Sequence, residues 1–96
     1  MVDKTMLIDD SEIDLFIHRR FLELCNFTKE VIAYRSAESA LEWLQNLNGD
    51  EPPSVIFLDL NMPRKTGHEC LSEIRNVEAY RQLPVVIYST SYIPEV

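Results

Sequence analysis

The sequence predicts an α/β fold in which a doubly wound parallel sheet carries helices on both faces. Short apolar runs alternate with segments of helical periodicity, in the order β-α-β-α-β-α-β. The run at residues 55–58 is apolar at every position, which is typical of a strand buried on both faces. With 96 residues, of which 46% are hydrophobic, the chain is expected to form one small domain over residues 1–96.

The first part of the chain predicts a strand, a helix and an edge strand. Residues 4–8 form a short apolar run that stops at two aspartates. Residues 27–34 form a second strand, whose charged entry suits the edge of a sheet. Between them, the Ser-x-x-Asp pattern of residues 11–14 indicates a helix start, and this helix is expected to run to about residue 24.

Two apolar strips run along this predicted first helix. The larger strip is expected to face the core. The smaller strip lies nearly opposite and is expected to be at the surface, or to meet a missing segment or a partner. The larger strip consists of Ile13, Phe16, Ile17, Phe21 and Leu24, and the smaller one of Leu15 and Leu22.

The rest of the chain predicts two further helices and two further strands. A helix opens at residues 36–39 and ends at residues 48–49, where Asn-Gly can turn left-handed. The central strand at residues 55–58 follows, and a loop at residues 64–67 leads into the third helix. The last strand covers residues 83–88. The expected buried positions of these two helices are Ala37, Ala40, Leu41 and Leu44, and Cys70, Ile74 and Val77.

Composition and charge exclude several classes of function. A net charge of −7 argues against direct binding of nucleic acid, so a protein partner or a cation is expected instead. The apolar runs are too short for a membrane span, and the start lacks a secretory profile, so a cytoplasmic protein is expected. Cys25 and Cys70 form no CxxC pair and are expected to be reduced thiols. His18 and His68 are expected to be surface or capping side chains.

Polar residues follow three of the four predicted strands. Asp9 and Asp10 come after the first, Asp59 after the third, and Ser89 and Thr90 after the fourth. Because the carboxyl ends of parallel strands share one edge of the sheet, these side chains are expected to converge. A single aspartate after a strand would be read as a turn residue or a cap. Because Asp9 and Asp10 are expected to lie beside Asp59, a shared site is the better interpretation.

The expected acidic cluster favours magnesium and phosphoryl chemistry. Clustered carboxylates repel each other unless a proton or a cation is shared among them. Mg²⁺ suits such a site because it binds carboxylates, a backbone carbonyl and water, and leaves room for a phosphate oxygen. A carboxylate can also attack phosphorus and become an acyl phosphate. In that step the metal and a nearby hydroxyl would stabilise charge on the transferring oxygens.

Three segments carry a resemblance to a known family: Leu7-Ile-Asp-Asp10, Phe57-Leu-Asp-Leu-Asn-Met-Pro63 with Gly67 following, and Leu83-Pro-Val-Val-Ile-Tyr-Ser89. Together and in this order, they resemble a response-regulator receiver domain of two-component signalling, of the chemotaxis-regulator type. The resemblance implies a flavodoxin-like fold with strand order 2-1-3-4, in which the family's fifth strand and last two helices are absent from this chain.

The same resemblance implies a role for each matching residue. Asp59 would be the phospho-acceptor, receiving a phosphoryl group from a histidine of a kinase or a histidine phosphotransfer protein. Asp10 would bind Mg²⁺ directly and Asp9 mainly through water, with further metal contacts from Asp59 and the backbone carbonyl of Asn61. Ser89 would contact a phosphoryl oxygen and move inward on activation. The remaining implied roles are tuning of dephosphorylation by Asn61 and Ser91, and shaping of the loop by Met62, Pro63 and Gly67.

The chain also departs from the family pattern. The family continues through a fourth helix, a fifth strand that ends in an essential Lys, and a fifth helix, whereas this chain stops at Val96. None of Lys4, Lys29 and Lys65 stands at the position of that Lys, and Tyr88 lies on the wrong strand to be the family's switch aromatic. Three explanations stay open: an ordered part of a longer chain, a truncation rescued by homodimerisation, and a degenerate receiver that binds partners without phosphorylation.

The function expected from the sequence is phospho-acceptance rather than enzymatic turnover. Such a receiver assists its own phosphorylation and dephosphorylation and signals to an output protein by contact, without a membrane. The alternative is a phosphorylation-independent interaction scaffold. A phosphatase of the haloacid dehalogenase type would need an aspartate two residues after Asp59, where Asn61 stands. A nucleotide-binding module is disfavoured because Gly49 and Gly67 are the chain's two glycines, too few for a phosphate cradle.

Overall fold

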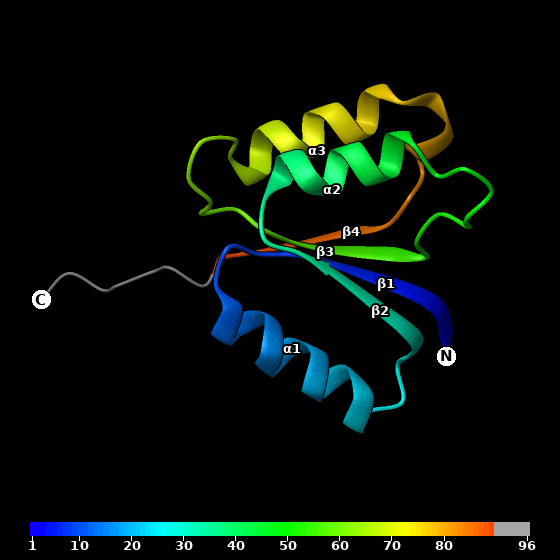
Figure 1. Cartoon of the computed structure of the whole chain (residues 1–96), viewed down its shortest axis with the longest axis vertical. Coiled ribbons are helices and arrows are strands. Elements are labelled where there is room, and N and C mark those ends of the chain that lie inside the picture. Colours follow the sequence, from blue (N-terminus) through cyan, green and yellow to red (C-terminus); the bar gives the residue numbers. More distant parts are fainter. Residues whose placement is uncertain (90–96) are drawn as a thin grey trace, which may run out of the picture.

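The chain folds in the predicted order of strands and helices (Figure 1). A computed structural model describes residues 1–89. The elements are β1 (Val2–Ile8), α1 (Glu12–Leu24), β2 (Thr28–Tyr34), α2 (Ala37–Gln45), β3 (Val55–Asp59), α3 (Gly67–Asn76), a 3₁₀ turn (Glu78–Tyr80) and β4 (Val85–Tyr88). Within residues 1–89, no helix is both long enough and apolar enough to cross a membrane.

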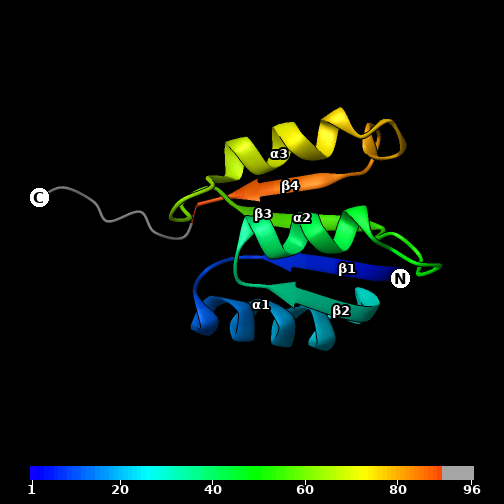
Figure 2. The ribbon, with the colours of Figure 1, turned by 45° about the horizontal axis from the view of Figure 1, so that its top comes forward.

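The four strands form one parallel sheet in the order β2-β1-β3-β4 (Figure 2). This confirms the fold class and the strand order that the resemblance implied, and it confirms β2 as an edge strand. Ile8 pairs with both Tyr34 and Leu58, and Asp59 pairs with Tyr88. The strands therefore end at nearly the same level, so the residues that follow them gather at one edge of the sheet.

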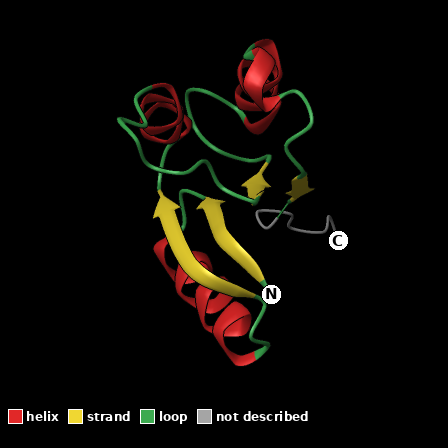
Figure 3. Cartoon of the chain, turned by 90° about the vertical axis from the view of Figure 1, so that its right-hand side faces the viewer, coloured by secondary structure: helices red, strands yellow, loops and turns green. Residues whose placement is uncertain are grey.

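Helices α2 and α3 cover one face of the sheet and build the larger core (Figure 3). Alternate residues of the central strands point into it, because successive side chains of a strand point to opposite faces. The predicted buried stripe of α2 is confirmed, as are the buried positions Cys70 and Ile74 of α3. This core consists of Met6, Ile8, Ala37, Ala40, Leu41, Leu44, Ile56, Leu58, Met62, Cys70, Ile74 and Tyr80.

Among residues 1–89, α1 is the helix that covers the other face, and it does so with the strip that the sequence placed outside. Leu15 and Leu22 are each 8% exposed and pack with Leu7 of β1. The prediction that the larger strip faces the core was wrong. Its members are 53–72% exposed: Ile13, Phe16, Ile17, Phe21 and Leu24. The physical reason is that a single helix reaches the sheet with one narrow strip, and the buried strip here packs against residues of β1 and β2 and against Phe57 of β3.

The helix ends show which local signals were accurate. Ser11 caps α1 by accepting a hydrogen bond from the Asp14 N–H at 3.2 Å, as the Ser-x-x-Asp pattern predicted. Helix α2 ends at Gln45, earlier than predicted, because Asn46 leaves the helical region and its Nδ2 donates to the Glu42 carbonyl at 2.9 Å. Helix α3 begins with a capping box in which the Thr66 and Glu69 side chains accept each other's backbone N–H.

Candidate functional site

Three carboxylates converge at the carboxyl edge of the sheet. Asp9 and Asp10 follow β1, and Asp59 ends the neighbouring strand β3. One oxygen of each carboxylate lies within 4.8 Å of the others. Asp9 and Asp59 are completely buried, whereas Asp10 is half-buried at the mouth of the cluster. The parallel register thus brings together the three acidic residues that the sequence singled out.

Asp9 is held through both of its carboxylate oxygens. The Ser11 N–H donates to Oδ1 at 2.9 Å, and the Tyr88 hydroxyl donates to Oδ2 at 2.7 Å. Burial raises the pKa of Asp9 above its ordinary value; these two hydrogen bonds oppose the shift, and the nearby charge of Asp59 adds to it. Asp9 is therefore a fixed carboxylate with few free lone pairs, and the more exposed Asp10 is better placed for direct contact with a cation.

The loop after β3 is folded tightly against Asp59. The Asn61 N–H donates to Asp59 Oδ1 at 3.1 Å, and the Gly67 N–H donates to the Leu60 carbonyl at 3.3 Å. A Cβ added at Gly67 would lie 2.6 Å from the Asp59 carbonyl oxygen and 2.6 Å from the Leu60 Cα. Met62 is buried, which anchors the turn in the larger core. The close approach of α3 to Asp59 therefore requires glycine at position 67.

Ser89 and Asn61 meet at the rim of the cluster. Asn61 Nδ2 donates a hydrogen bond to the Ser89 hydroxyl oxygen, and both residues are exposed. The predicted phosphoryl-contact residue therefore lies beside the loop that carries Asp59. Ser91, to which the sequence assigned a tuning role, lies outside the described residues, as does Thr90.

The three lysines of the chain interact elsewhere in the described structure. Lys4 Nζ donates to the Glu51 carbonyl at 2.8 Å and lies 5.3 Å from the centre of the Trp43 ring. Lys29 pairs with Asp3 at 3.3 Å, and Lys65 pairs with Glu73. That none of the three supplies the family's phosphoryl-pairing Lys stays a prediction.

Sequence reasoning missed the contact that Tyr88 makes with the cluster. Tyr88 ends β4, two strands from β1 in the sheet, and its hydroxyl still reaches Asp9. Its ring meets the His18 ring edge-on, with centroids 5.0 Å apart, so His18 is half-buried against it. Burial, followed by the hydrogen bond to Asp9, raises the pKa of Tyr88, which keeps the hydroxyl protonated as a donor. The available signal was a tyrosine directly before Ser89.

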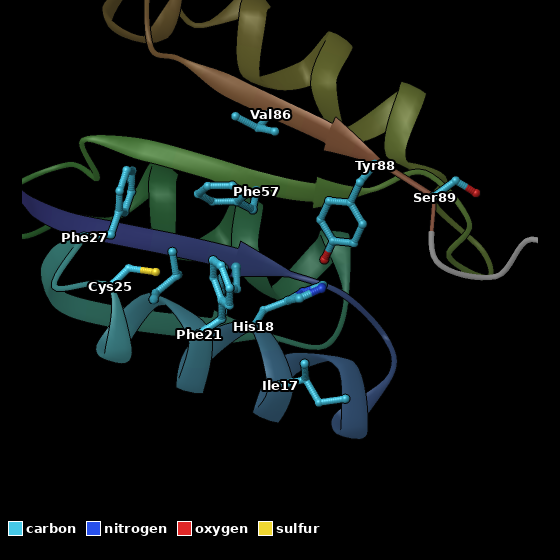
Figure 4. A pocket seen from close by; sticks show the side chains of 11 residues that line it. Ile17, His18, Phe21, Cys25, Phe27, Phe57, Val86, Tyr88 and Ser89 are labelled. Atoms are coloured by element: carbon cyan, nitrogen blue, oxygen red, sulfur yellow. The ribbon is translucent and has the colours of Figure 1, made fainter.

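An apolar groove of about 720 Å³ runs between α1 and the β3–β4 half of the sheet (Figure 4). Tyr88 and Ser89 stand at the end of the groove that is next to the acidic cluster. The groove is lined by Leu7, Ile17, His18, Phe21, Leu22, Cys25, Phe27, Phe57, Val86, Tyr88 and Ser89. The groove therefore borders the candidate site.

The donor set fits a hard divalent cation. The cluster offers three carboxylates, and the Asn61 backbone carbonyl follows Asp59 by two residues. Mg²⁺ and similar ions prefer such oxygen ligands and usually retain several waters, which the half-buried Asp10 side of the cluster can admit. A bound cation would also relieve the repulsion among the carboxylates.

Comparisons with known proteins agree with this geometry. The family model described as "Response regulator receiver domain" matches residues 5–94. Response regulator Rcp1 from Synechocystis sp. is 33% identical over 90 residues, which cover 91% of this chain and 61% of that protein. Two-component response regulator ARR5 from Arabidopsis thaliana is 35% identical over 97 residues, which cover 92% of this chain and 51% of that protein. The chain thus spans 51–61% of the length of these relatives.

Solved structures show the same likeness. The phosphorylated cyanobacterial phytochrome response regulator RcpA has a TM-score of 0.84 and 30% identity, over 97% of this chain and 69% of that chain. The Mn²⁺-bound form of response regulator Rcp1 has a TM-score of 0.75 and 31% identity, over 95% of this chain and 68% of that chain. With the family model covering nearly its whole length, the chain belongs to the response regulator receiver domains of two-component systems.

Proposed function

We propose that this receiver domain accepts a phosphoryl group on Asp59 from a histidine kinase or a histidine phosphotransfer protein, with Mg²⁺ as cofactor, and signals by protein contact. The observation that carries the proposal is the convergence of Asp59 with Asp9 and Asp10 at one sheet edge. The relatives support it, since one solved neighbour is described as phosphorylated and another as Mn²⁺-bound.

The proposed reaction is a phosphoryl transfer between two side chains. A carboxylate oxygen of Asp59 attacks the phosphorus of a phosphohistidine and forms an O–P bond. The N–P bond breaks, its electron pair returns to the imidazole nitrogen, and that nitrogen is protonated from solvent. Mg²⁺ supplies charge neutralisation on the transferring oxygens when it is bound. The product is an aspartyl phosphate.

The residues around Asp59 have separate tasks in this proposal. Asp10 and Asp9 would hold the cation, and the Asn61 N–H keeps the acceptor carboxylate in place through its 3.1 Å hydrogen bond. The Ser89 hydroxyl contacts a phosphoryl oxygen once its bond with Asn61 opens. Asn61 carries no titratable proton, so it does not act as an acid for hydrolysis. In this proposal the chain is a phospho-acceptor that assists its own phosphorylation and dephosphorylation rather than a turnover enzyme.

The direct test is intact mass spectrometry after incubation with Mg²⁺ and acetyl phosphate. We expect a gain of one phosphoryl group that disappears in Asp59→Asn and in excess EDTA. Asp50→Asn is a matched control, because Asp50 is an exposed loop aspartate and should leave uptake unchanged. Uptake that persists in Asp59→Asn would contradict the assignment of the acceptor.

One observation favours a second candidate, a scaffold that binds partners without phosphorylation. The three lysines interact elsewhere, so no Lys of the described residues is assigned to pair with the phosphoryl group. Folded wild-type protein that takes up no phosphoryl group, from acetyl phosphate or from a phosphorylated histidine phosphotransfer protein, would identify this scaffold.

A further inference from the structure

We propose that Tyr88 is a positioning residue for the metal site: its hydroxyl fixes the Asp9 carboxylate in the orientation that Mg²⁺ requires. The inference rests on the metal part of the proposed function and does not depend on phosphorylation. It concerns a residue of this chain whose sequence position alone suggested no role at the site.

The two hydrogen-bond donors to Asp9 differ in how far they lie from it along the sequence. The Ser11 N–H is a local donor, two residues away, and fixes Oδ1 at 2.9 Å. The Tyr88 hydroxyl is 79 residues away and fixes Oδ2 at 2.7 Å. Without the second donor, the carboxylate could turn about its bond to Cβ while Oδ1 kept its local partner. Tyr88 therefore sets the plane of the carboxylate.

The path of this hydrogen bond crosses the acidic cluster. Tyr88 lies on β4 and pairs in register with Asp59 of β3, and Asp9 follows β1 on the far side of β3. The Tyr88 side chain thus spans from the outer strand to the first strand on the α1 side of the sheet, as Figure 4 shows for its ring and hydroxyl. One residue ties together the ends of three strands that carry the site.

Tyr88 is itself held in place, which makes it a useful support. Its backbone carbonyl accepts a hydrogen bond from the Leu60 N–H at 2.9 Å, directly after Asp59. The Tyr88 and His18 rings meet at a right angle with centroids 5.0 Å apart, and both residues line the apolar groove. The orientation of the Tyr88 hydroxyl therefore depends on the contact between its ring and α1. A change in the packing of the groove would be expected to move this hydroxyl, and with it the Asp9 carboxylate.

The expected effect follows from how cations differ in their demands. Mg²⁺ requires near-ideal octahedral geometry, whereas Ca²⁺ accepts varied coordination numbers and longer distances. Loss of an outer group that orients the residues or waters around a metal typically lowers metal affinity about 10–100-fold, and Tyr88 is such a group because it orients Asp9. If Tyr88 positions Asp9, Tyr88→Phe lowers the Mg²⁺ affinity about tenfold and the Ca²⁺ affinity by clearly less. The ratio of the two affinities is a readout that a merely structural role would not change.

The test is calorimetric titration of the purified chain with MgCl₂ and with CaCl₂. Tyr34→Phe is the matched control, because it removes the same hydroxyl at the end of β2 from a ring that packs against the α2–α3 core. His18→Ala is a second variant on a half-buried helix position, and it should reduce Mg²⁺ affinity by less than Tyr88→Phe. Circular dichroism melts show whether each variant is folded.

The outcomes separate cleanly. A selective loss of Mg²⁺ affinity in Tyr88→Phe, with Tyr34→Phe unchanged, supports the positioning role. Unchanged Mg²⁺ affinity, an equal loss for both cations, or the same loss in Tyr34→Phe would overturn it, as would a wild-type chain that binds no Mg²⁺. If Tyr88→Phe does not fold, the ratio in His18→Ala decides. Because the titration involves no phosphodonor, failure of phosphoryl uptake and failure of this inference are distinguished.

Discussion

The two faces of the sheet differ sharply in how completely they are covered. In the described part of the chain, residues 1–89, twelve buried residues form one core cluster on the α2–α3 face, whereas three buried residues meet beneath α1 on the other face. The same face carries the apolar groove and the exposed apolar strip of α1. The comparison teaches that both faces bury side chains that stabilise the fold, but the α1 face also leaves apolar surface next to the functional edge.

The acidic site draws on both faces. The loop that carries Asp59 is fixed from the α2–α3 side by the buried Met62 and by the close approach of Gly67. Asp9 is fixed from the α1 side, by Tyr88 and its neighbour His18. Substitutions at Gly67 on the first face and at Tyr88 on the second should therefore both reach the site.

The largest expected effect is in the complete core. Ile74 of α3 is fully buried, so Ile74→Ala should lower the free energy of unfolding by about 2–5 kcal/mol through lost burial and the cavity that remains. Urea denaturation followed by circular dichroism measures this change. Ser72→Ala, at an exposed position of the same helix, is the control and should stay near wild type. A loss below 1 kcal/mol for Ile74→Ala would show that this core contributes less to stability than expected.

A smaller effect is expected where α3 approaches Asp59. Gly67→Ala places a methyl group against two backbone atoms, which cannot move away as a side chain would. We expect a loss of about 1–3 kcal/mol in the free energy of unfolding. Because the displaced backbone carries Asp59, slower phosphoryl uptake from acetyl phosphate should accompany it. His68→Ala changes the next, exposed residue and should alter neither quantity; equal behaviour of the two variants would contradict the close approach.

A pH-dependent effect is expected at Asp9, where the faces meet. Burial raises its pKa in the folded state, so the folded state binds a proton more readily than the unfolded state. The stabilising contribution of Asp9 is therefore fully present below the ordinary aspartate pKa. It is lost as the pH rises through the raised pKa of Asp9 in the folded state. Without divalent cations, Asp9→Asn should raise the melting temperature at pH 7, and the gain should vanish near pH 3. Melting curves of both proteins in EDTA across this range measure the effect.

Addition of Mg²⁺ reverses this comparison. The wild-type chain should then gain stability by binding the ion, because a ligand that binds only the folded state stabilises it. Asp9→Asn should gain less, since it lacks one negative ligand. If Asp9→Asn is less stable than wild type in EDTA at pH 7, the buried Asp9 carboxylate does not destabilise the metal-free protein, and the prediction is wrong.

Much of the fold and the location of the site were predictable because their signals are local. Residues 55–58 are apolar without interruption, and the aspartates stand directly at strand ends. In a parallel sheet the carboxyl ends of all strands lie at the same edge. The convergence of Asp9, Asp10 and Asp59 could therefore be predicted from the order of the elements. The approach of Gly67 to the loop was also expected from the resemblance, and the backbone distances give its cause.

Two features could not be predicted because they depend on distant parts of the chain. Hydrophobic periodicity shows that α1 has apolar strips, but the strip that is buried depends on which strands lie beneath it. The hydrogen bond between Tyr88 and Asp9 needs both the strand order and the side-chain direction, neither of which a window of sequence contains. A tyrosine in a strand is typical of ordinary core packing, so its position directly before Ser89 was a signal too weak to indicate this hydrogen bond.

The smallest expected effect tests the uncovered face itself. Phe16 is 69% exposed on α1, so Phe16→Ala should change the free energy of unfolding by no more than about 0.5 kcal/mol. Leu22→Ala, on the buried strip of the same helix, should lower it by about 2–5 kcal/mol. The periodicity of the sequence predicted the opposite ranking, so urea denaturation of the two variants decides between the two orientations of α1. A large loss in Phe16→Ala that grows with protein concentration would mean that a second copy covers this face in solution, because only association makes stability depend on concentration.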